Sequence, residues 1–132
     1  MTSTAIDHDS IRGAIVYGSK ELYSMALYAL IDNAGKYQRL ESGDIRIFAK
    51  HDHKSNDVLI FIENDGIEIQ EEEANKIFTC DYRGNKAKEL NIDGSGIGLW
   101  LCAEILKRNT GEITLESRSE PVRFKIKLPR GR

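Results

Sequence analysis

Apolar residues recur at intervals of three and four in a long segment near the start of the chain. They form two neighbouring ridges, made by Leu22, Ala26, Leu30 and Ala34 on one side and by Tyr23, Leu27 and Ile31 on the next. This spacing is typical of an amphipathic helix with one buried face. We therefore expect a helix that begins after Ser19, a residue type favoured at helix N-caps, and runs to about Tyr37.

Other segments alternate apolar and polar residues with a period of two, which predicts strands. The clearest alternation is at 122–128, and further strands are expected at 14–17, 45–49, 58–62 and 113–115. Residues 58–62 are continuously apolar, which favours a central strand buried on both faces. The polar segments 51–57 and 117–121 are expected to form the turns of two hairpins.

Two shorter helices are expected at 71–78 and 99–108, and the second should end near Gly111. Between them, residues 79–95 are polar and show no period. A long loop inside a compact domain is usually functional, so we expect a lid here. Three helices and about five strands predict a two-layer α/β sandwich, in which helices cover one face of a mixed, mostly antiparallel sheet.

The composition is that of one folded domain: 132 residues, of which 40% are hydrophobic. Nineteen basic and 21 acidic residues leave a net charge of −2, which provides no general attraction to nucleic acid or to an acidic membrane. The longest apolar run, 25–31, is too short to span a bilayer. Residues 1–11 are expected to be a flexible leader before a domain at 12–132, and Cys80 and Cys102 indicate reduced thiols in a cytoplasmic protein.

The first candidate site is the glycine-rich run 94–99 at the start of a predicted helix, Gly94-Ser95-Gly96-Ile97-Gly98-Leu99. Glycines let a ligand approach the backbone, and free N–H groups at a helix start bind anions such as phosphate. An ordinary glycine-rich turn is the alternative. The run lacks the preceding strand that a Rossmann site requires and the closing Gly-Lys-Ser/Thr that a P-loop requires.

Two further motifs carry side chains that can bind a nucleotide. At the end of the long helix, Asn33 offers an amide oxygen for a hard cation such as Mg²⁺, Lys36 a cation for phosphate, and Tyr37 a ring for a base. After the buried strand, Asn64-Asp65-Gly66 offers an acceptor for the amino group of a purine. Taken alone, each motif is more often a solvated helix end or a plain turn.

Taken together and in this order, the motifs resemble the ATP-binding catalytic domain of sensor histidine kinases, which shares a superfamily with gyrase B, heat-shock chaperones and mismatch-repair ATPases. Residues 29–37 resemble its asparagine box, 62–69 its first glycine box, 76–84 its phenylalanine box and 94–99 its second glycine box. The resemblance covers about residues 14 to 129 and implies a Bergerat-type ATP-binding fold.

The resemblance also implies roles for matching positions. Asn33 would hold Mg²⁺, and Asn33 and Lys36 would be the catalytic residues. Catalysis would consist of positioning the γ-phosphate and neutralising its charge. The implied nucleotide-binding residues are Asn33, Lys36, Tyr37, Asn64, Asp65, Gly66, Ile69, Tyr82, Arg83, Gly94, Ser95, Gly96, Ile97, Gly98 and Leu99.

The chain departs from the family pattern at several positions. Asn64 occupies the place of the aspartate that binds the adenine amino group, and Asp65 follows one residue later. Glu68 replaces the second glycine of the same box, and Asp81 replaces an aromatic residue. Ala29 lies where the ATP-hydrolysing members carry a glutamate general base, which disfavours gyrase-like or chaperone-like hydrolysis.

The implied function is that of an ATP- and Mg²⁺-dependent histidine kinase domain. It would donate the γ-phosphoryl group to a histidine on a separate dimerisation domain, with a response regulator downstream. We expect no nucleic-acid partner and no direct membrane contact by this domain, although the parent protein can be membrane-anchored. Two alternatives stay open: a degenerate module that binds or regulates other proteins, suggested by Asn64 and Glu68, and a serine kinase like the anti-sigma factors.

Overall fold

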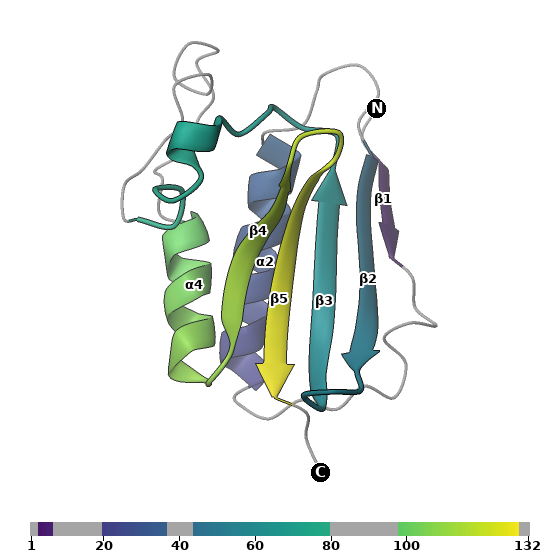
Figure 1. Ribbon diagram of the computed structural model, residues 1–132, viewed down its shortest axis with the longest axis vertical. Coiled ribbons are helices and arrows are strands. Elements are labelled where there is room, and N and C mark those ends of the chain that lie inside the picture. The colour runs from purple at the N-terminus through teal and green to yellow at the C-terminus, as the bar shows by residue number, and fades with distance from the viewer. Residues whose placement is uncertain (1–2, 7–19, 37–43, 80–97, 130–132) are drawn as a thin grey trace.

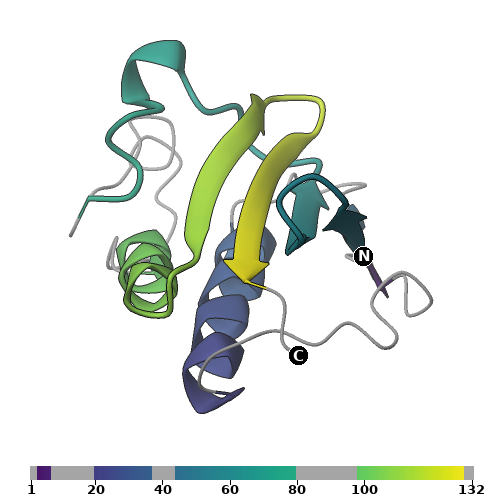
Figure 2. The ribbon, with the colours of Figure 1, turned by 60° about the horizontal axis from the view of Figure 1, so that its bottom comes forward.

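A computed structural model of the protein describes residues 3–6, 20–36, 44–79 and 98–129. In chain order the elements are β1 (Ser3–Ile6), α2 (Lys20–Lys36), β2 (Asp44–Asp52), β3 (Asp57–Asn64), the 3-10 helix η1 (Glu71–Glu73), α4 (Gly98–Arg108), β4 (Glu112–Arg118) and β5 (Val122–Pro129). The strands form one sheet, and α2 and α4 lie side by side against one of its faces (Figures 1 and 2). This is the predicted two-layer α/β sandwich.

The sheet has the strand order β1-β2-β3-β5-β4, so β3 is central. The pair β1–β2 is parallel, and the other three pairs are antiparallel. The predicted mixed, mostly antiparallel sheet of five strands is therefore confirmed. The register places Ile62 of β3 opposite Ile47 of β2 and Phe124 of β5, which brings apolar side chains of three strands to one face.

The core lies between this face and the two helices. Along β5, buried and half-buried residues alternate strictly, as the period-two pattern predicts. The helices contribute the side chains that repeat at helical spacing. The most deeply buried side chains are Leu30 of α2, Cys102 and Leu106 of α4, Ile62 of β3, and Phe124 and Ile126 of β5. Their removal from water is the main stabilising term of the fold.

Both α-helices of the described residues lie on one face of the sheet. On the opposite face, side chains of neighbouring strands pack against one another. Phe48 of β2 and Phe61 of β3 stack with ring centroids 5.0 Å apart and an interplanar angle of 16°. The Lys50 ammonium lies 5.7 Å from the Phe61 centroid, within cation–π range. These contacts leave Phe61 only 7% exposed, so β3 is well shielded on both faces.

Two local expectations need correction, and two others are not tested. Residues 3–6, inside the expected leader, form the edge strand β1, because their backbone can pair with the outer edge of β2. The expected helix at 71–78 is only a 3-10 turn at 71–73, and Gln70 provides no side-chain cap for a longer helix. The expected strand at 14–17 and the lid at 79–95 lie outside the described residues, apart from Thr79.

The turn between α4 and β4 requires glycine at position 111. The Gly111 N–H donates to the carbonyl of Leu106 at 2.7 Å and ends the helix. A Cβ at this position would lie 2.8 Å from the Lys127 carbonyl oxygen and 2.9 Å from Cδ2 of Leu128. Thr110, just before it, has φ of 60°. Neither helix of the described residues is long and apolar enough to cross a membrane.

Candidate functional site

Three of the predicted motifs meet at one end of the sheet. The end of β3, the C-terminal end of α2 and the start of α4 all point toward the top of Figure 1, on the side of η1. The start of α4 lies against α2: a Cβ added to Gly98 would be 3.7 Å from the carbonyl oxygen of Ala29, one helical turn before Asn33. The second glycine box and the asparagine box, about 60 residues apart in sequence, are thus neighbours in space.

Asn64 is the polar residue that ends β3 at this site. The register places it opposite Ile45 of β2 and Val122 of β5, both buried, so its side chain lies on the helix-covered face. It is 3% exposed. No described residue offers its side-chain amide a hydrogen bond. A buried polar group without a partner costs about 1–3 kcal/mol, so this amide is chemically suited to receive a ligand.

Asp65 points the other way. Its carboxylate accepts hydrogen bonds from Arg46 at 3.3 and 3.5 Å, across the open face of the sheet. The bond to Asp65 is also the largest cause that raises the pKa of the Arg46 guanidinium above its ordinary value. Asn64 and Asp65, which the sequence could not distinguish as base-binding residues, therefore occupy different faces.

An ion cluster around the buried Glu63, missed from the sequence, supports the end of β3. Glu63 is 6% exposed, and its carboxylate accepts a hydrogen bond from Arg46 Nε at 3.2 Å and pairs with Arg123. Both arginines lie directly opposite Glu63 in the register, one on β2 and one on β5. The sequence feature that could have predicted this cluster is a glutamate in an otherwise apolar strand, with an arginine in each of the two alternating strands that pair with it.

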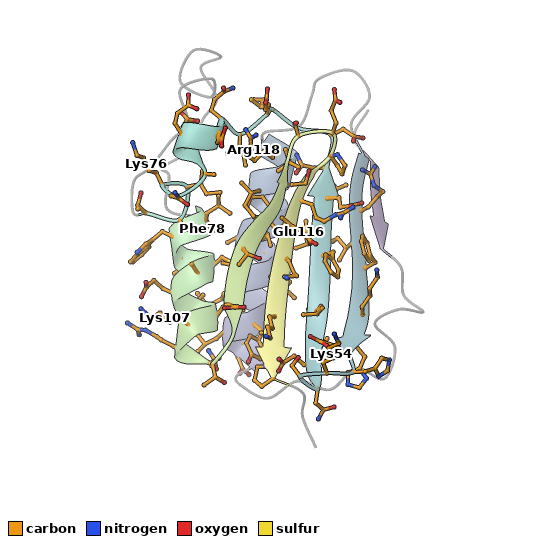
Figure 3. All side chains as sticks on the ribbon, viewed as in Figure 1. Lys54, Lys76, Phe78, Lys107, Glu116 and Arg118 are labelled. Atoms are coloured by element: carbon orange, nitrogen blue, oxygen red, sulfur yellow. The ribbon has the colours of Figure 1, made fainter. Side chains whose placement is uncertain are left out.

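The segment after Gly66 is tied to the sheet by its backbone. The Ile69 N–H donates to the Arg118 carbonyl at 3.0 Å, and Arg118 Nη1 donates back to the Ile69 carbonyl at 3.4 Å. Gly66 is buried, Ile69 packs against the core, and the side chain of Glu68 is exposed. Figure 3 shows Arg118 at the same end of the sheet as η1. The first glycine box thus runs along the edge of the site.

The described part of the phenylalanine box is anchored to the core. Ile77 is 7% exposed, and the Phe78 ring meets Phe124 edge-on at a centroid distance of 6.1 Å. Figure 3 shows Phe78 beside the upper end of α4 and Lys76 farther out on the same segment. This anchor fixes where the chain leaves the site at Thr79.

The remaining predicted site residues are described in part or not at all. Asn33 and Lys36 lie in the last two turns of α2, but only their backbone is described. Gly98 and Leu99 form the first turn of α4, and Leu99 packs against the core. The predicted residues outside the described part are Tyr37, Tyr82, Arg83, Gly94, Ser95, Gly96 and Ile97.

Other clusters in the described residues lie away from this end. His51 and His53 meet edge-on at 4.8 Å in the β2–β3 hairpin, and His51 Nε2 lies 3.0 Å from Asn56 Oδ1. Figure 3 shows Lys54 of this hairpin at the opposite end of the sheet. Among the residues whose positions are given, no three His, Cys, Asp or Glu side chains gather as a metal site. A small polar hollow near Asp57 and Lys127 is also at the far end.

Comparison with known proteins agrees with this arrangement. The sequence model of the family described as "Histidine kinase-, DNA gyrase B-, and HSP90-like ATPase" matches residues 18–132. A probable sensor kinase, SilS of Salmonella typhimurium, is 29% identical over 116 residues, which are 88% of this chain and 23% of SilS. The sensor protein SrrB of Staphylococcus aureus is 31% identical over 102 residues, 76% of this chain and 17% of SrrB.

Among solved structures, the catalytic domain of histidine kinase ThkA superposes with a TM-score of 0.74 at 25% identity, covering 98% of this chain and 79% of that one. The chain spans about a fifth of the length of the two curated relatives.

Proposed function

The chain belongs to the histidine kinase-, DNA gyrase B- and HSP90-like ATPase family, and we propose that it is the ATP- and Mg²⁺-binding catalytic domain of a sensor histidine kinase. It is a histidine kinase ATPase-like domain of the kind found in sensor kinases. In the proposed reaction, it donates the γ-phosphoryl group of ATP to a histidine on a separate dimerisation domain.

The observation that carries the proposal is the buried amide of Asn64, to which no residue in the described part of the chain hydrogen-bonds. In the proposed complex, the adenine ring enters between the sheet and the helices, and Asn64 Oδ1 accepts a hydrogen bond from the 6-amino group. Ile45 and Val122 flank Asn64 in the register and provide apolar surface beside the base. The residues present therefore fit an adenine base at this end of β3.

The phosphate and metal roles follow from the two helix ends. A helix C-terminus carries a partial negative charge, which favours a cation. Asn33 lies near the end of α2, and its amide oxygen would bind Mg²⁺, which neutralises charge on the phosphates when bound. A helix N-terminus favours anions, and Gly98 begins α4 beside Ala29. We assign the triphosphate to the gap between them, with Lys36 and Arg83 as further cations.

In the proposed reaction the domain positions the γ-phosphate and neutralises its charge. Phosphoryl transfer requires little more from the protein, because no covalent bond to the domain has to form. Ala29 has no ionisable side chain, so position 29 cannot activate water. A nucleophile delivered by another domain fits this site better than water. We accordingly propose a phosphoacceptor domain and a downstream response regulator as partners, and a cytoplasmic site of action.

Calorimetric titration of the purified protein with ATP, with and without Mg²⁺, tests the binding step. We expect Mg²⁺-dependent binding that weakens by about tenfold or more in Asn33→Ala, the cost of a lost ligand to the metal. Asn75→Ala, an exposed asparagine beyond η1, is the matched control and should bind as the wild type does. Labelling of an added histidine-containing dimerisation fragment from γ-labelled ATP then tests the transfer step.

Absence of ATP binding by folded protein would contradict the proposal and favour the degenerate regulatory module. In that case Asn64→Asp combined with Glu68→Gly should create binding that the wild type lacks. Binding without transfer to any histidine fragment would retain the ATP site and reject the kinase step.

A further inference from the structure

The Asn64 amide is a two-way hydrogen-bonding group. Its oxygen accepts and its nitrogen donates, and a half-turn about χ2 exchanges the two. An ionised carboxylate at the same position only accepts. Position 64 therefore determines which purine edges the pocket can recognise.

Nothing described around Asn64 fixes the orientation of this amide. Its register neighbours, Ile45 and Val122, are apolar and impose neither a donor nor an acceptor. The two nearest carboxylates in sequence, Glu63 and Asp65, are engaged by Arg46 on the opposite face. No described residue hydrogen-bonds to the amide. Among the described residues, nothing opposes a half-turn of the amide beyond the cost of one torsion.

From this geometry we propose that the base pocket accepts 6-oxopurine nucleoside triphosphates as well as ATP, with Asn64 as the specificity-determining residue. The proposal rests on the proposed function, because it concerns the same nucleotide site. Toward adenine, Oδ1 accepts from the 6-amino group and Nδ2 donates to N1. Toward a 6-oxopurine, the turned amide donates from Nδ2 to O6 and accepts at Oδ1 from the N1–H.

A carboxylate in this place has no donor for either edge. Toward a 6-oxopurine, one oxygen accepts from N1–H while the other faces the lone pairs of O6. Toward adenine, one oxygen accepts from the amino group while the other faces the lone pair of N1. Each case leaves two buried acceptors without a donor, which disfavours binding by about tenfold or more. Exchange of amide for carboxylate should therefore weaken the binding of both purine classes, because only the amide forms two hydrogen bonds with either edge.

The experiment compares dissociation constants for ATP, ITP and GTP with Mg²⁺ in the wild type and in Asn64→Asp. Measurement at about pH 8, well above the ordinary carboxyl pKa, favours the ionised form of the introduced side chain. Because ITP carries the 6-oxo group and N1–H without the 2-amino group of GTP, it tests Asn64 recognition directly. We expect ITP to bind the wild type within about tenfold of ATP, and Asn64→Asp to bind both nucleotides more weakly than the wild type does, by about tenfold or more.

Asp57→Asn is the matched control, since it changes a carboxylate at the far end of β3 and should leave the dissociation constants of both nucleotides unchanged. The ratio of the ITP and ATP dissociation constants in the wild type requires no variant, so it tests the inference even if a variant fails to fold. ATP binding with ITP and GTP each more than about a hundredfold weaker would overturn the inference and leave the proposed function standing. Absence of binding by all three nucleotides would overturn the proposed function itself.

Discussion

Glu63 and Asn64 are consecutive residues of β3 whose side chains leave the sheet on opposite faces. The Glu63 carboxylate pairs with Arg46 and Arg123 on the open face, whereas the Asn64 amide is buried on the face that the helices cover. Because successive strand residues alternate sides, the ion cluster holds the strand end from one face while the other face presents Asn64. The cluster thus stabilises the strand end that carries the proposed base-binding amide.

Neutralising Glu63 should destabilise the protein. Glu63→Gln removes the buried negative charge that two arginines share, and we expect the free energy of unfolding to fall by about 2 kcal/mol. The value is below the full cost of breaking a buried ion pair because Arg46 and Arg123 are 37% and 35% exposed. Urea unfolding followed by circular dichroism measures it.

Glu116→Gln on β4 is the control, because Glu116 is exposed (Figure 3) and should change stability by less than about 0.5 kcal/mol. Equal losses of unfolding free energy in the two variants would show that Glu63 contributes no more to stability than an exposed glutamate does.

The two residues after Glu63 should differ sharply in their effect on ATP binding. Asn64→Ala removes the buried amide, and we expect the dissociation constant for ATP to rise by about tenfold or more. Asp65→Ala releases a carboxylate held by Arg46 on the other face, and we expect a change below about threefold. Titration calorimetry of both variants makes the comparison. A larger loss in Asp65→Ala would assign the base to Asp65 instead.

Gly111 should tolerate no side chain. Gly111→Ala places a Cβ 2.8 Å from a backbone oxygen of β5, so the turn must shift, and we expect a loss of about 2 kcal/mol in unfolding free energy. Thr110→Gly next to it relieves a β-branched residue at φ of 60° and should leave stability unchanged or raise it by up to about 1 kcal/mol. Thermal melts that rank the two variants in the reverse order would contradict this.

The Cys102 thiol should be unreactive in the native protein. It is 0% exposed, and burial raises its pKa from 9.0 to about 12. In a Cys80→Ser background, we expect a thiol reagent to label Cys102 in urea but not under native conditions. The unfolded thiol ionises above about pH 9 and the folded one does not, so stability should fall as pH rises from about 9 to 12. Rapid native labelling would show that α4 opens readily.

Much of the fold could be predicted because its signals are local. Helical spacing at 22–34 and strict alternation at 122–128 predicted α2 and β5, which the structure shows at Lys20–Lys36 and Val122–Pro129. The short elements were harder to predict from the sequence. Residues 3–6 form a strand only because β2 offers them an unpaired edge, and 71–73 close into a 3-10 turn where a weak helical pattern lacked a cap.

The site was predictable as a set of motifs but not as a geometry. The order of Asn33, Asn64 and the glycine run at 94–99 is a property of the chain and indicated a nucleotide site by itself. The partner of each side chain is a property of the register between strands far apart in sequence. Arg46 and Arg123 are 17 and 60 residues from Glu63, and no local pattern relates them.

Most elements, the family resemblance and the chemical identity of the candidate residues could be predicted from the chain alone, because each depends on residue type and short-range spacing. Which of Asn64 and Asp65 enters the covered face depends instead on the fold. The strand period assigns neighbours to opposite sides, but the pairing of β3 with β2 and β5 determines which side is buried. That pairing engages Asp65 with Arg46 and buries the Asn64 amide, to which no described residue hydrogen-bonds.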